Sequence, residues 1–300
     1  MTKRILLLVA LSGVVGVSLA SAAPRGFAWH DTPTGTTAHF RGLSAVSATT
    51  AWVSGYTATD GVVLRTTNRG ASWQNVSPAG AVGLQFRDIE AFDADHAVAM
   101  SIGNNPTDFR IYVTSNGGQT WSITQQNTNP GAFYDCMTFF DNRRGLLVSD
   151  PPDGQHFLVL ATDDGGLHWH VTGQQMPQAL PGEAAFAASG QCITSHGGRA
   201  WFGTTAGRVF RSDDRGASWT VAQTPVASGG LVRGVQVWPP SFVVAVNLSP
   251  ARAALPPPNA MPLRASRNPM DWGPTPPRVV IGSVSTDHVL PKFAVCSTRP

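Results

Sequence analysis

The chain has 300 residues, of which only 13% are charged, while Gly (31) and Pro (23) are frequent. This composition favours many short strands joined by turns over a helical bundle, and the length allows one large domain or two ordinary ones. The net charge of +3 is unevenly spread, because residues 23–229 carry 12 Lys and Arg against 16 Asp and Glu, whereas residues 230–300 carry 7 against 2. Since no basic stripe is interleaved with aromatic residues, we expect no nucleic-acid partner.

Residues 1–22 have the features of a signal peptide. Lys3 and Arg4 precede the apolar run ILLLVALSGVVGVSLA, which is followed by the small-residue cleavage site at residues 20–22. The apolar run is shorter than the roughly 20 residues that a membrane span needs. We therefore expect cleavage after Ala22, export to the periplasm or the cell exterior, and no membrane span in the mature chain. An uncleaved N-terminal anchor is the alternative.

An eight-residue stretch, here called the box, recurs four times. The copies are TTNRGASW at residues 66–73, TSNGGQTW at 114–121, TDDGGLHW at 162–169 and SDDRGASW at 212–219. The Trp residues that end them lie 48, 48 and 50 residues apart. A fixed period in this range is typical of solenoids, propellers and arrays.

The residues between the boxes decide among these architectures. The first repeat contains four short apolar runs, FRGLSAVS, TAWVSGYT, GVVLRTTN and SWQNVSP, and the second repeat has the same order. Four antiparallel strands in a unit of this length form a propeller blade. The sequence therefore predicts an all-β fold, with propeller blades over residues 23–229 and a box at the turn between the third and fourth strands of each blade.

Each box position has a structural role that its side chain suggests. A hydroxyl at the first position can tie the two ends of the turn, and an Asx side chain at the third can accept backbone N–H groups. Glycine at the fifth can adopt positive φ, and the final Trp can pack under the turn. The third-position residues are Asn68, Asn116, Asp164 and Asp214; the fifth-position residues are Gly70, Gly118, Gly166 and Gly216; the final residues are Trp73, Trp121, Trp169 and Trp219.

Trp29 lies 44 residues before Trp73 and has no box before it. The stretch WHDTPTGTTAHFRGL after Trp29 parallels WQNVSPAGAVGLQFRDI after Trp73. We therefore expect Trp29 to open a fourth strand that completes the last blade of a ring, with the other strands of that blade supplied by the C-terminal residues.

The pattern Ser/Thr-x-Asp/Asn-x-Gly-x-x-Trp is similar to the Asp-box, or BNR, motif. Together with the runs FRGLSAV, FRDIEAF and FYDCMTFFD, it makes the chain resemble exported bacterial BNR-repeat proteins related to the photosystem II assembly/stability factor, within the sialidase-like superfamily. The resemblance covers residues 27 to about 229. It implies a propeller of six or seven blades, which would leave this chain incomplete after about residue 230. It does not imply photosynthesis, because one fold serves many functions.

Residues 230–300 depart from the repeat and contain 13 of the 23 Pro. They form either a natural Pro-rich tail or a frameshifted remnant of later blades. The second interpretation rests on codons. Read one base later, Pro-Met-Asp-Trp-Gly at residues 269–273 becomes x-Trp-Thr/Ile-Gly, and Asn268 contributes Thr or Ile two places before this Trp. If the codon of Arg267 ends in a suitable base, it contributes Gly, which gives the end of a box, Gly-Thr-x-Trp-Thr. The recovered Trp would lie about one period, roughly 50 residues, after Trp219.

Polar side chains at the start of each predicted inner strand are candidates for a binding site at the mouth of the central channel. Aligned repeat by repeat, they are Arg41, Arg87 with Asp88, Tyr134 with Asp135, and Glu183, so that Tyr134 is expected at the place of the two arginines. Arginine binds carboxylate or phosphate groups through two parallel hydrogen bonds. The alternative is that these residues fill a solvated channel and pair with one another.

We expect a non-catalytic binding or assembly scaffold, without cofactor or metal, that holds a protein or another extracellular ligand at the channel mouth. A sialidase-like or other glycan hydrolase is the alternative. Sialidases, which share the Asp-box, need three Arg, an Asp acid and a Tyr nucleophile with its Glu base, and glycosidases more generally use two carboxyl groups. The stretch FRGL at Phe40–Leu43 lacks the Ile and Pro of the sialidase Phe-Arg-Ile-Pro signature, and no third Arg stands at an equivalent place. We therefore assign no catalytic residue.

Cys136, Cys192 and Cys296 are the three cysteines of the chain, and their spacing is not that of a metal site. An oxidising export compartment would permit a disulfide between Cys136 and Cys192. The alternative is that these are two small buried residues.

Overall fold

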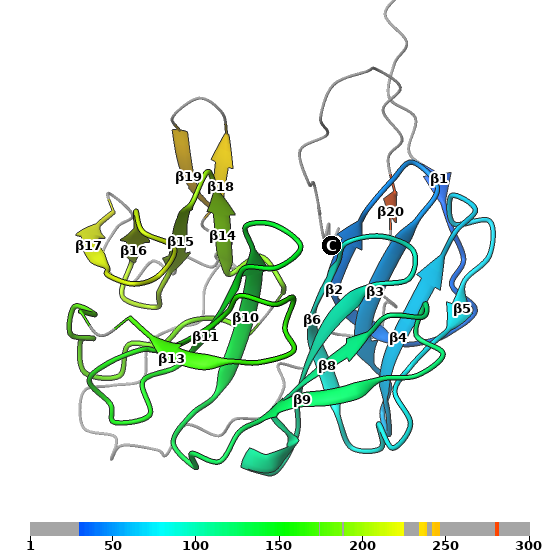
Figure 1. Ribbon diagram of the computed structural model, residues 1–300, viewed down its shortest axis with the longest axis horizontal. Coiled ribbons are helices and arrows are strands. Elements are labelled where there is room, and N and C mark those ends of the chain that lie inside the picture. Colours follow the sequence, from blue (N-terminus) through cyan, green and yellow to red (C-terminus); the bar gives the residue numbers. More distant parts are fainter. Residues whose placement is uncertain are drawn as a thin grey trace, which may run out of the picture.

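The computed structural model describes residues 30–173, 175–187, 189–224, 234–238, 242–246 and 280–281. These residues form four successive four-stranded antiparallel sheets, each built from four strands that are consecutive in the chain (Figure 1). The predicted all-β fold with four-stranded blades is therefore confirmed. The signal peptide, Trp29, Cys296 and most of the Pro-rich residues lie outside the described residues. Within the described part of the chain, no helix is long and apolar enough to cross a membrane.

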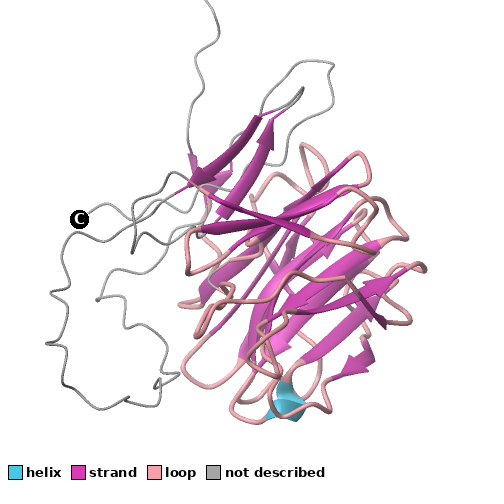
Figure 2. Cartoon of the chain, turned by 90° about the vertical axis from the view of Figure 1, so that its left-hand side faces the viewer, coloured by secondary structure: helices cyan, strands magenta, loops and turns pink. Residues whose placement is uncertain are grey.

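The strands of the first two blades follow the predicted runs closely. The first blade consists of β2 (His39–Ala45), β3 (Ala51–Tyr56), β4 (Gly61–Thr66) and β5 (Gln74–Asn75). The second consists of β6 (Gln85–Ala91), β7 (Ala97–Ile102), β8 (Arg110–Thr114) and β9 (Ser122–Gln126). A short 3-10 helix, η1 (Pro106–Asp108), joins β7 to β8 and is the cyan coil in Figure 2.

The third and fourth blades repeat this order. The third consists of β10 (Tyr134–Phe139), β11 (Gly145–Ser149), β12 (Leu158–Thr162) and β13 (His170–Thr172). The fourth consists of β14 (Ile193–His196), β15 (Arg199–Gly203), β16 (Arg208–Ser212) and β17 (Thr220–Gln223). The first strands of neighbouring blades contact one another, β2 with β6, β6 with β10 and β10 with β14.

The hydrophobic core lies between the blades. Trp52 of the first blade packs in one cluster with Phe86 of the second, and Met100 of the second packs in another with Met137 of the third. The second strands β7 and β11 are buried along their whole length because neighbouring sheets cover both of their faces. A single blade therefore cannot bury its apolar side chains alone, and each blade stabilises the next.

Two further pairs of strands lie outside the four blades. β18 (Gly234–Trp238) and β19 (Phe242–Val246) form an antiparallel hairpin that contacts β14 and β15 of the fourth blade. The strand pattern thus extends past residue 230. β1 (His30–Asp31) pairs with β20 (Val280–Ile281), so the N-terminal strand meets one C-terminal strand in a two-stranded sheet. The completion of a whole last blade by the C-terminal residues stays a prediction. The origin of the Pro-rich residues stays a prediction.

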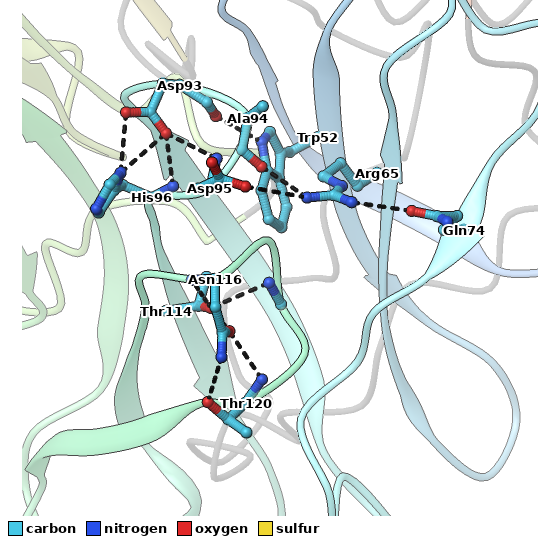
Figure 3. Close-up of polar contacts among 11 residues, drawn as sticks. Trp52, Arg65, Gln74, Asp93, Ala94, Asp95, His96, Thr114, Asn116 and Thr120 are labelled. Atoms are coloured by element: carbon cyan, nitrogen blue, oxygen red, sulfur yellow. Dashed lines mark hydrogen bonds and ion pairs between the residues drawn. The ribbon is translucent and has the colours of Figure 1, made fainter.

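All four boxes form the same hydrogen-bonded turn. The first-position hydroxyl accepts the N–H of the fifth-position glycine, at 2.9, 3.0, 3.0 and 2.7 Å in chain order. The third-position Asn or Asp accepts the N–H of the seventh residue, at 3.0, 3.0, 2.9 and 2.9 Å. The hydroxyl also donates to the Asx oxygen, at 2.8–3.1 Å. Figure 3 shows the second box, with Thr114, Asn116 and Thr120.

Each box also contacts the blade that precedes it. In each box the fifth-position glycine contacts the residue three places after the Trp of the preceding repeat. In the first two boxes, a Cβ added to the glycine would meet the side chain of that residue. In the last two, the glycine carbonyl accepts a hydrogen bond from the hydroxyl of that residue. The four pairs are Gly70 with Thr32, Gly118 with Val76, Gly166 with Thr124 and Gly216 with Thr172. Because Thr32 stands three residues after Trp29, the N-terminal strand takes the place of a preceding blade for the first box. The box is therefore a joint between blades as well as a corner.

Polar side chains reinforce the joint between the first two blades (Figure 3). The Trp52 indole donates a hydrogen bond to the carbonyl of Asp93 at 3.0 Å, and the Arg65 guanidinium lies 5.5 Å from the Trp52 ring. Arg65 donates to the carbonyl of Ala94 at 2.8 Å. These bonds reach the turn between β6 and β7, so they fix the second blade against the first.

The fourth box position also requires the left-handed backbone conformation, which the sequence analysis did not anticipate. The φ angles there are 71° at Gly117 and 79° at Gly165, but also 64° at Arg69 and 57° at Arg215. A side chain with a Cβ is strained in this region. Two of the four boxes therefore carry backbone strain at an exposed arginine.

We predict that Gly118→Ala destabilises the protein more than Gly80→Ala does. Both glycines have positive φ, 81° and 74°, so both substitutions incur a backbone cost of about 1–2 kcal/mol. A Cβ at Gly118 would lie 2.7 Å from Cβ of Val76, whereas nothing lies within 4 Å at Gly80. Overpacking adds about 1–3 kcal/mol at Gly118 alone. Urea unfolding of the two variants measures the difference, and equal losses would contradict the joint described above.

We predict that Arg69→Gly and Arg215→Gly each stabilise the protein by up to about 1 kcal/mol, because glycine relieves the left-handed strain. The matched control is Lys at the same positions, which keeps the Cβ and the charge and is expected to leave stability unchanged. Thermal unfolding of the four single variants tests this. A loss of stability in the glycine variants would show that the arginine side chains contribute more than their backbone strain costs.

Candidate functional site

β-Bulges place three polar side chains at equivalent positions of the first three blades. The pairing of β2 with β3 shifts register between Phe40 and Gly42, which leaves Arg41 as the extra residue. The same shift leaves Arg87 extra in β6 and Asp135 extra in β10. A bulge turns the side chain of its extra residue away from the regular alternation of the strand.

The bulges correct one register of the sequence analysis, which aligned Tyr134 with Arg41 and Arg87. Tyr134 is equivalent to Phe40 and Phe86, the residues that precede the bulges, and Asp135 is equivalent to the two arginines. Tyr134 is accordingly buried, at 1% exposed, in the apolar cluster between the second and third blades. Burial raises the pKa of its hydroxyl above the ordinary value.

Arg41 and Arg87 lie side by side around one aromatic ring. Their guanidinium carbons are 5.7 and 5.9 Å from the centre of the Tyr56 ring, and Arg41 donates a hydrogen bond to the Tyr56 hydroxyl at 3.2 Å. The ring of His39 lies 5.6 Å from the same ring. The sequence did not identify Tyr56, at the end of β3, or His39, at the start of β2. The two residues are cross-strand partners, so a predicted register of β2 against β3 could have placed them together.

Placing the positive charges of Arg41 and Arg87 this close together costs electrostatic free energy. Burial, and next to it repulsion by Arg41, lower the pKa of Arg87 to about 10, while Tyr56 and Asp135 each raise it by a smaller amount. Arg87 donates one hydrogen bond to the side-chain oxygen of Gln85 at 2.7 Å and another to the carbonyl of Ala187 at 3.0 Å. Both arginine residues remain partly exposed to solvent.

Asp135 is buried and pairs with the partly exposed carboxylate of Asp150. Burial raises the pKa of Asp135 well above its ordinary value, the Asp150 carboxylate raises it further, and Arg87 lowers it. Asp150 accepts the backbone N–H of Ala185 at 2.8 Å. Asp150 was not identified from the sequence, although it directly follows the β11 strand that pairs with β10. The pair shares a proton more readily than it carries two negative charges.

The remaining two candidates from the sequence have structural partners. Asp88 is buried and accepts the N–H groups of Ile89 and Met137, both at 2.8 Å, so it joins the second blade to the third. Glu183 forms an ion pair with Arg208. Burial would raise the pKa of Glu183, but hydrogen bonds from the Arg208 guanidinium and from a threonine hydroxyl outweigh it and lower the pKa. The six candidates therefore do not form one open funnel.

Cys136 and Cys192 form a disulfide, with their Cα atoms 6.0 Å apart. Cys136 follows the bulge residue Asp135 in β10, and Cys192 directly precedes β14. Both cysteines are buried, at 0% and 1% exposed. Of the two alternatives left open by the sequence, the structure shows the disulfide, and it joins the inner strands of the third and fourth blades.

The arrangement suits binding of an anion better than acid–base catalysis. The two arginines can donate hydrogen bonds to a carboxylate or a phosphate, while Asp88 and Asp135 are sealed from solvent at 2% and 1% exposed. Within the described residues, no three His, Cys, Asp or Glu side chains gather closely enough to hold a metal ion.

No protein-family model and no curated protein matches this chain. Among solved structures it is similar to YCF48 bound to D1 peptide, with 12% identity, a TM-score of 0.41, and 77% of this chain and 95% of that chain covered. It is also similar to YCF48 from Cyanidioschyzon merolae (15% identity, TM-score 0.38, 70% and 93% covered). A third similar structure is the GH74 xyloglucanase from Xanthomonas campestris (16%, 0.41, 70% and 33% covered). These likenesses are too distant to assign a family or an activity.

We predict that Asp135→Asn stabilises the protein at pH 7 and has little effect near pH 4. Because the pKa of Asp135 is higher in the folded state than its ordinary value of 3.8, the folded state binds more protons, and stability is lost as pH rises above about 4. The amide keeps the shape of the protonated carboxyl and does not ionise. Urea midpoints from pH 3.5 to 7.5 measure the difference.

Asp153→Asn is the control with the opposite sign. Hydrogen bonds from the backbone N–H groups of His156 and Gln155, and then from the His156 side chain, lower the pKa of Asp153 to about 2. Asp153 therefore stabilises the folded state above about pH 4, and this contribution disappears as pH falls toward 2. A lower urea midpoint for Asp135→Asn at pH 7 would mean that ionised Asp135 stabilises the fold through Arg87.

Proposed function

We propose that the protein is an exported, non-catalytic scaffold that binds an acidic segment of a protein partner through Arg41 and Arg87. The observation that carries the proposal is the convergence of two guanidinium groups on the Tyr56 ring, with Arg87 depressed in pKa by burial and by its neighbour. Two like charges held together in a partly buried place lose free energy of repulsion when an anion binds between them. Export is the expectation from residues 1–22.

A carboxylate is the anion that fits this setting best. Each guanidinium can offer parallel N–H groups to a carboxylate, and the Tyr56 ring supplies an apolar face beside them. The binding groups lie on first strands of two blades, which the box joints hold rigidly. A scaffold needs a fixed geometry of this kind because binding then orders little of the protein.

The glycan hydrolase alternative gains no support from the site geometry. A glycosidase needs carboxyl groups that reach its substrate. Asp88 accepts two backbone N–H groups inside the joint between the second and third blades, and Asp135 is enclosed with Asp150. Tyr134 is inside the core rather than at a surface. We therefore propose binding alone.

We predict that the Arg41→Gln, Arg87→Gln double variant binds a fluorescein-labelled hexaglutamate peptide at least tenfold more weakly than the wild type, because it loses both cations and keeps most of the side-chain volume. Fluorescence anisotropy at 50 and 200 mM salt measures the affinity, which should fall with salt for the wild type. Melting temperatures establish that both proteins are folded. Equal affinity of the two proteins, both with the Cys136–Cys192 disulfide intact and after its reduction, would refute the proposed site.

Arg199→Gln, Arg211→Gln is the matched control, since these two arginines lie on the fourth blade and pair with Asp213 at the surface. The control removes the same net charge, so it should retain the wild-type affinity if binding is local. A phosphopeptide of equal charge tests the anion, and tighter binding of the phosphopeptide would replace carboxylate by phosphate in the proposal. Turnover of a 4-methylumbelliferyl glycoside would favour the hydrolase.

A further inference from the structure

The connection between β13 and β14 reaches across to the inner strands of the first two blades. Its described residues 183–187 and 189–192, here called the strap, lead from the Glu183 ion pair to Cys192. The carbonyl of Ala187 accepts the hydrogen bond from Arg87 at 3.0 Å, and the N–H of Gly190 donates to the carbonyl of Arg41 at 3.4 Å. The strap therefore contacts both residues of the arginine pair, although it connects the third blade to the fourth.

Gly190 of the strap lies against Asp88 of the second blade. A Cβ added at Gly190 would overlap the carboxylate of Asp88. Only glycine lets the strap lie this close to the strand that carries Arg87. The strap is thus fitted to the inner strand of another blade and is not simply a loose connection.

The two ends of the strap are held in different ways. Near its start, the N–H of Ala185 donates to Asp150 at 2.8 Å, and Ala184 exchanges hydrogen bonds with Thr205 at 2.9 and 3.0 Å. Its far end is held covalently by the disulfide from Cys192 to Cys136 in β10. Cys192 continues directly into β14, which pairs with β15. Cutting the disulfide would therefore remove the covalent tie to β10, while β14 and the hydrogen bonds at the start still hold the two ends and the stretch between them can move.

We propose that the strap is a built-in blocker of the Arg41–Arg87 site, latched by the Cys136–Cys192 disulfide and opened when a dithiol reduces it. The Ala187 carbonyl occupies a guanidinium N–H of Arg87 that a bound carboxylate would use, so the strap and the ligand compete. This regulation rests on the proposed function, but the occlusion of Arg87 by the strap does not.

The opening reaction is an ordinary thiol–disulfide exchange. A thiolate of the dithiol attacks one sulfur of the disulfide, which releases the other cysteine as a thiolate and forms a mixed disulfide. The second thiol of the reagent then attacks the reagent's own sulfur in the mixed disulfide and releases the remaining cysteine. Two electrons and two protons pass to the protein, which gains the thiols of Cys136 and Cys192, while the dithiol becomes a cyclic disulfide. Because both cysteines are buried, the exchange requires transient lifting of the strap, and we expect it to be slow in the folded protein.

Modification of Arg87 by phenylglyoxal measures the occlusion directly. We expect the rate of Arg87 modification, followed by peptide mass spectrometry, to rise at least tenfold after reduction with dithiothreitol. Arg65, which is held against Trp52 in the first blade, serves as the internal control and should not change. Thiol labelling verifies reduction, and circular dichroism verifies the fold. An unchanged Arg87 rate in reduced, folded protein overturns the proposal.

A second variant tests the strap with the disulfide intact. Gly190→Ala should push the strap off Asp88 and raise Arg87 reactivity in the oxidised protein to the reduced level. The matched control is Gly182→Ala, because Gly182 has a φ of 73° and nothing within 4 Å, so only its backbone is strained. If Gly190→Ala leaves Arg87 as protected as Gly182→Ala does, the strap is not the blocker.

Binding of the hexaglutamate peptide separates this proposal from the proposed function. Reduction should strengthen peptide binding about as much as it raises Arg87 reactivity, and the Cys136→Ser, Cys192→Ser double variant should match the reduced protein. If reactivity rises but the peptide does not bind, the strap stands and the proposed function fails. If the oxidised protein binds the peptide through Arg87 and reduction changes neither quantity, the strap fails alone.

Discussion

The contact between each box and the blade before it is the constraint on which the structure depends. In every described junction, the fifth-position glycine of a box contacts the residue three places after the preceding Trp, either by close packing, as Gly118 with Val76, or through a hydrogen bond to the glycine carbonyl, as Gly166 with Thr124. Since the apolar side chains lie between blades, correct registration of neighbouring sheets decides whether the core closes. A repeated glycine solves this packing problem because a Cβ would separate the sheets.

Rigid registration of the blades has a consequence for the candidate site. Arg41 and Arg87 belong to different blades and are brought to one aromatic ring, which costs electrostatic free energy that the blade packing has to supply. The bulges aim both side chains in the same direction. An anion that binds there recovers this free energy, so the strain of the free protein favours binding.

The polar groups around Arg41 and Arg87 both stabilise the fold and control the access of a ligand to these arginines. Asp88 joins two blades, and Asp150 holds the start of the strap while it shares its surroundings with Asp135. The disulfide at Cys192 holds the other end of the strap. These residues thus fix the inner strands and hold the strap, whose Ala187 carbonyl accepts a hydrogen bond from Arg87. The stability of the blades is therefore linked to the access of a ligand to Arg87.

The blades follow from the sequence alone, because the box and the four apolar runs are local patterns with a fixed period. The sequence also located Arg41 and Arg87, which stand at the same place in two repeats. It misplaced Tyr134, since a bulge shifts register by one residue without a clear local signal, and it missed Tyr56, Asp150 and the strap. Those contacts join residues from different strands or different blades, such as Arg87 and Ala187. Local patterns cannot predict such contacts, because which distant strands meet depends on the packing of whole blades.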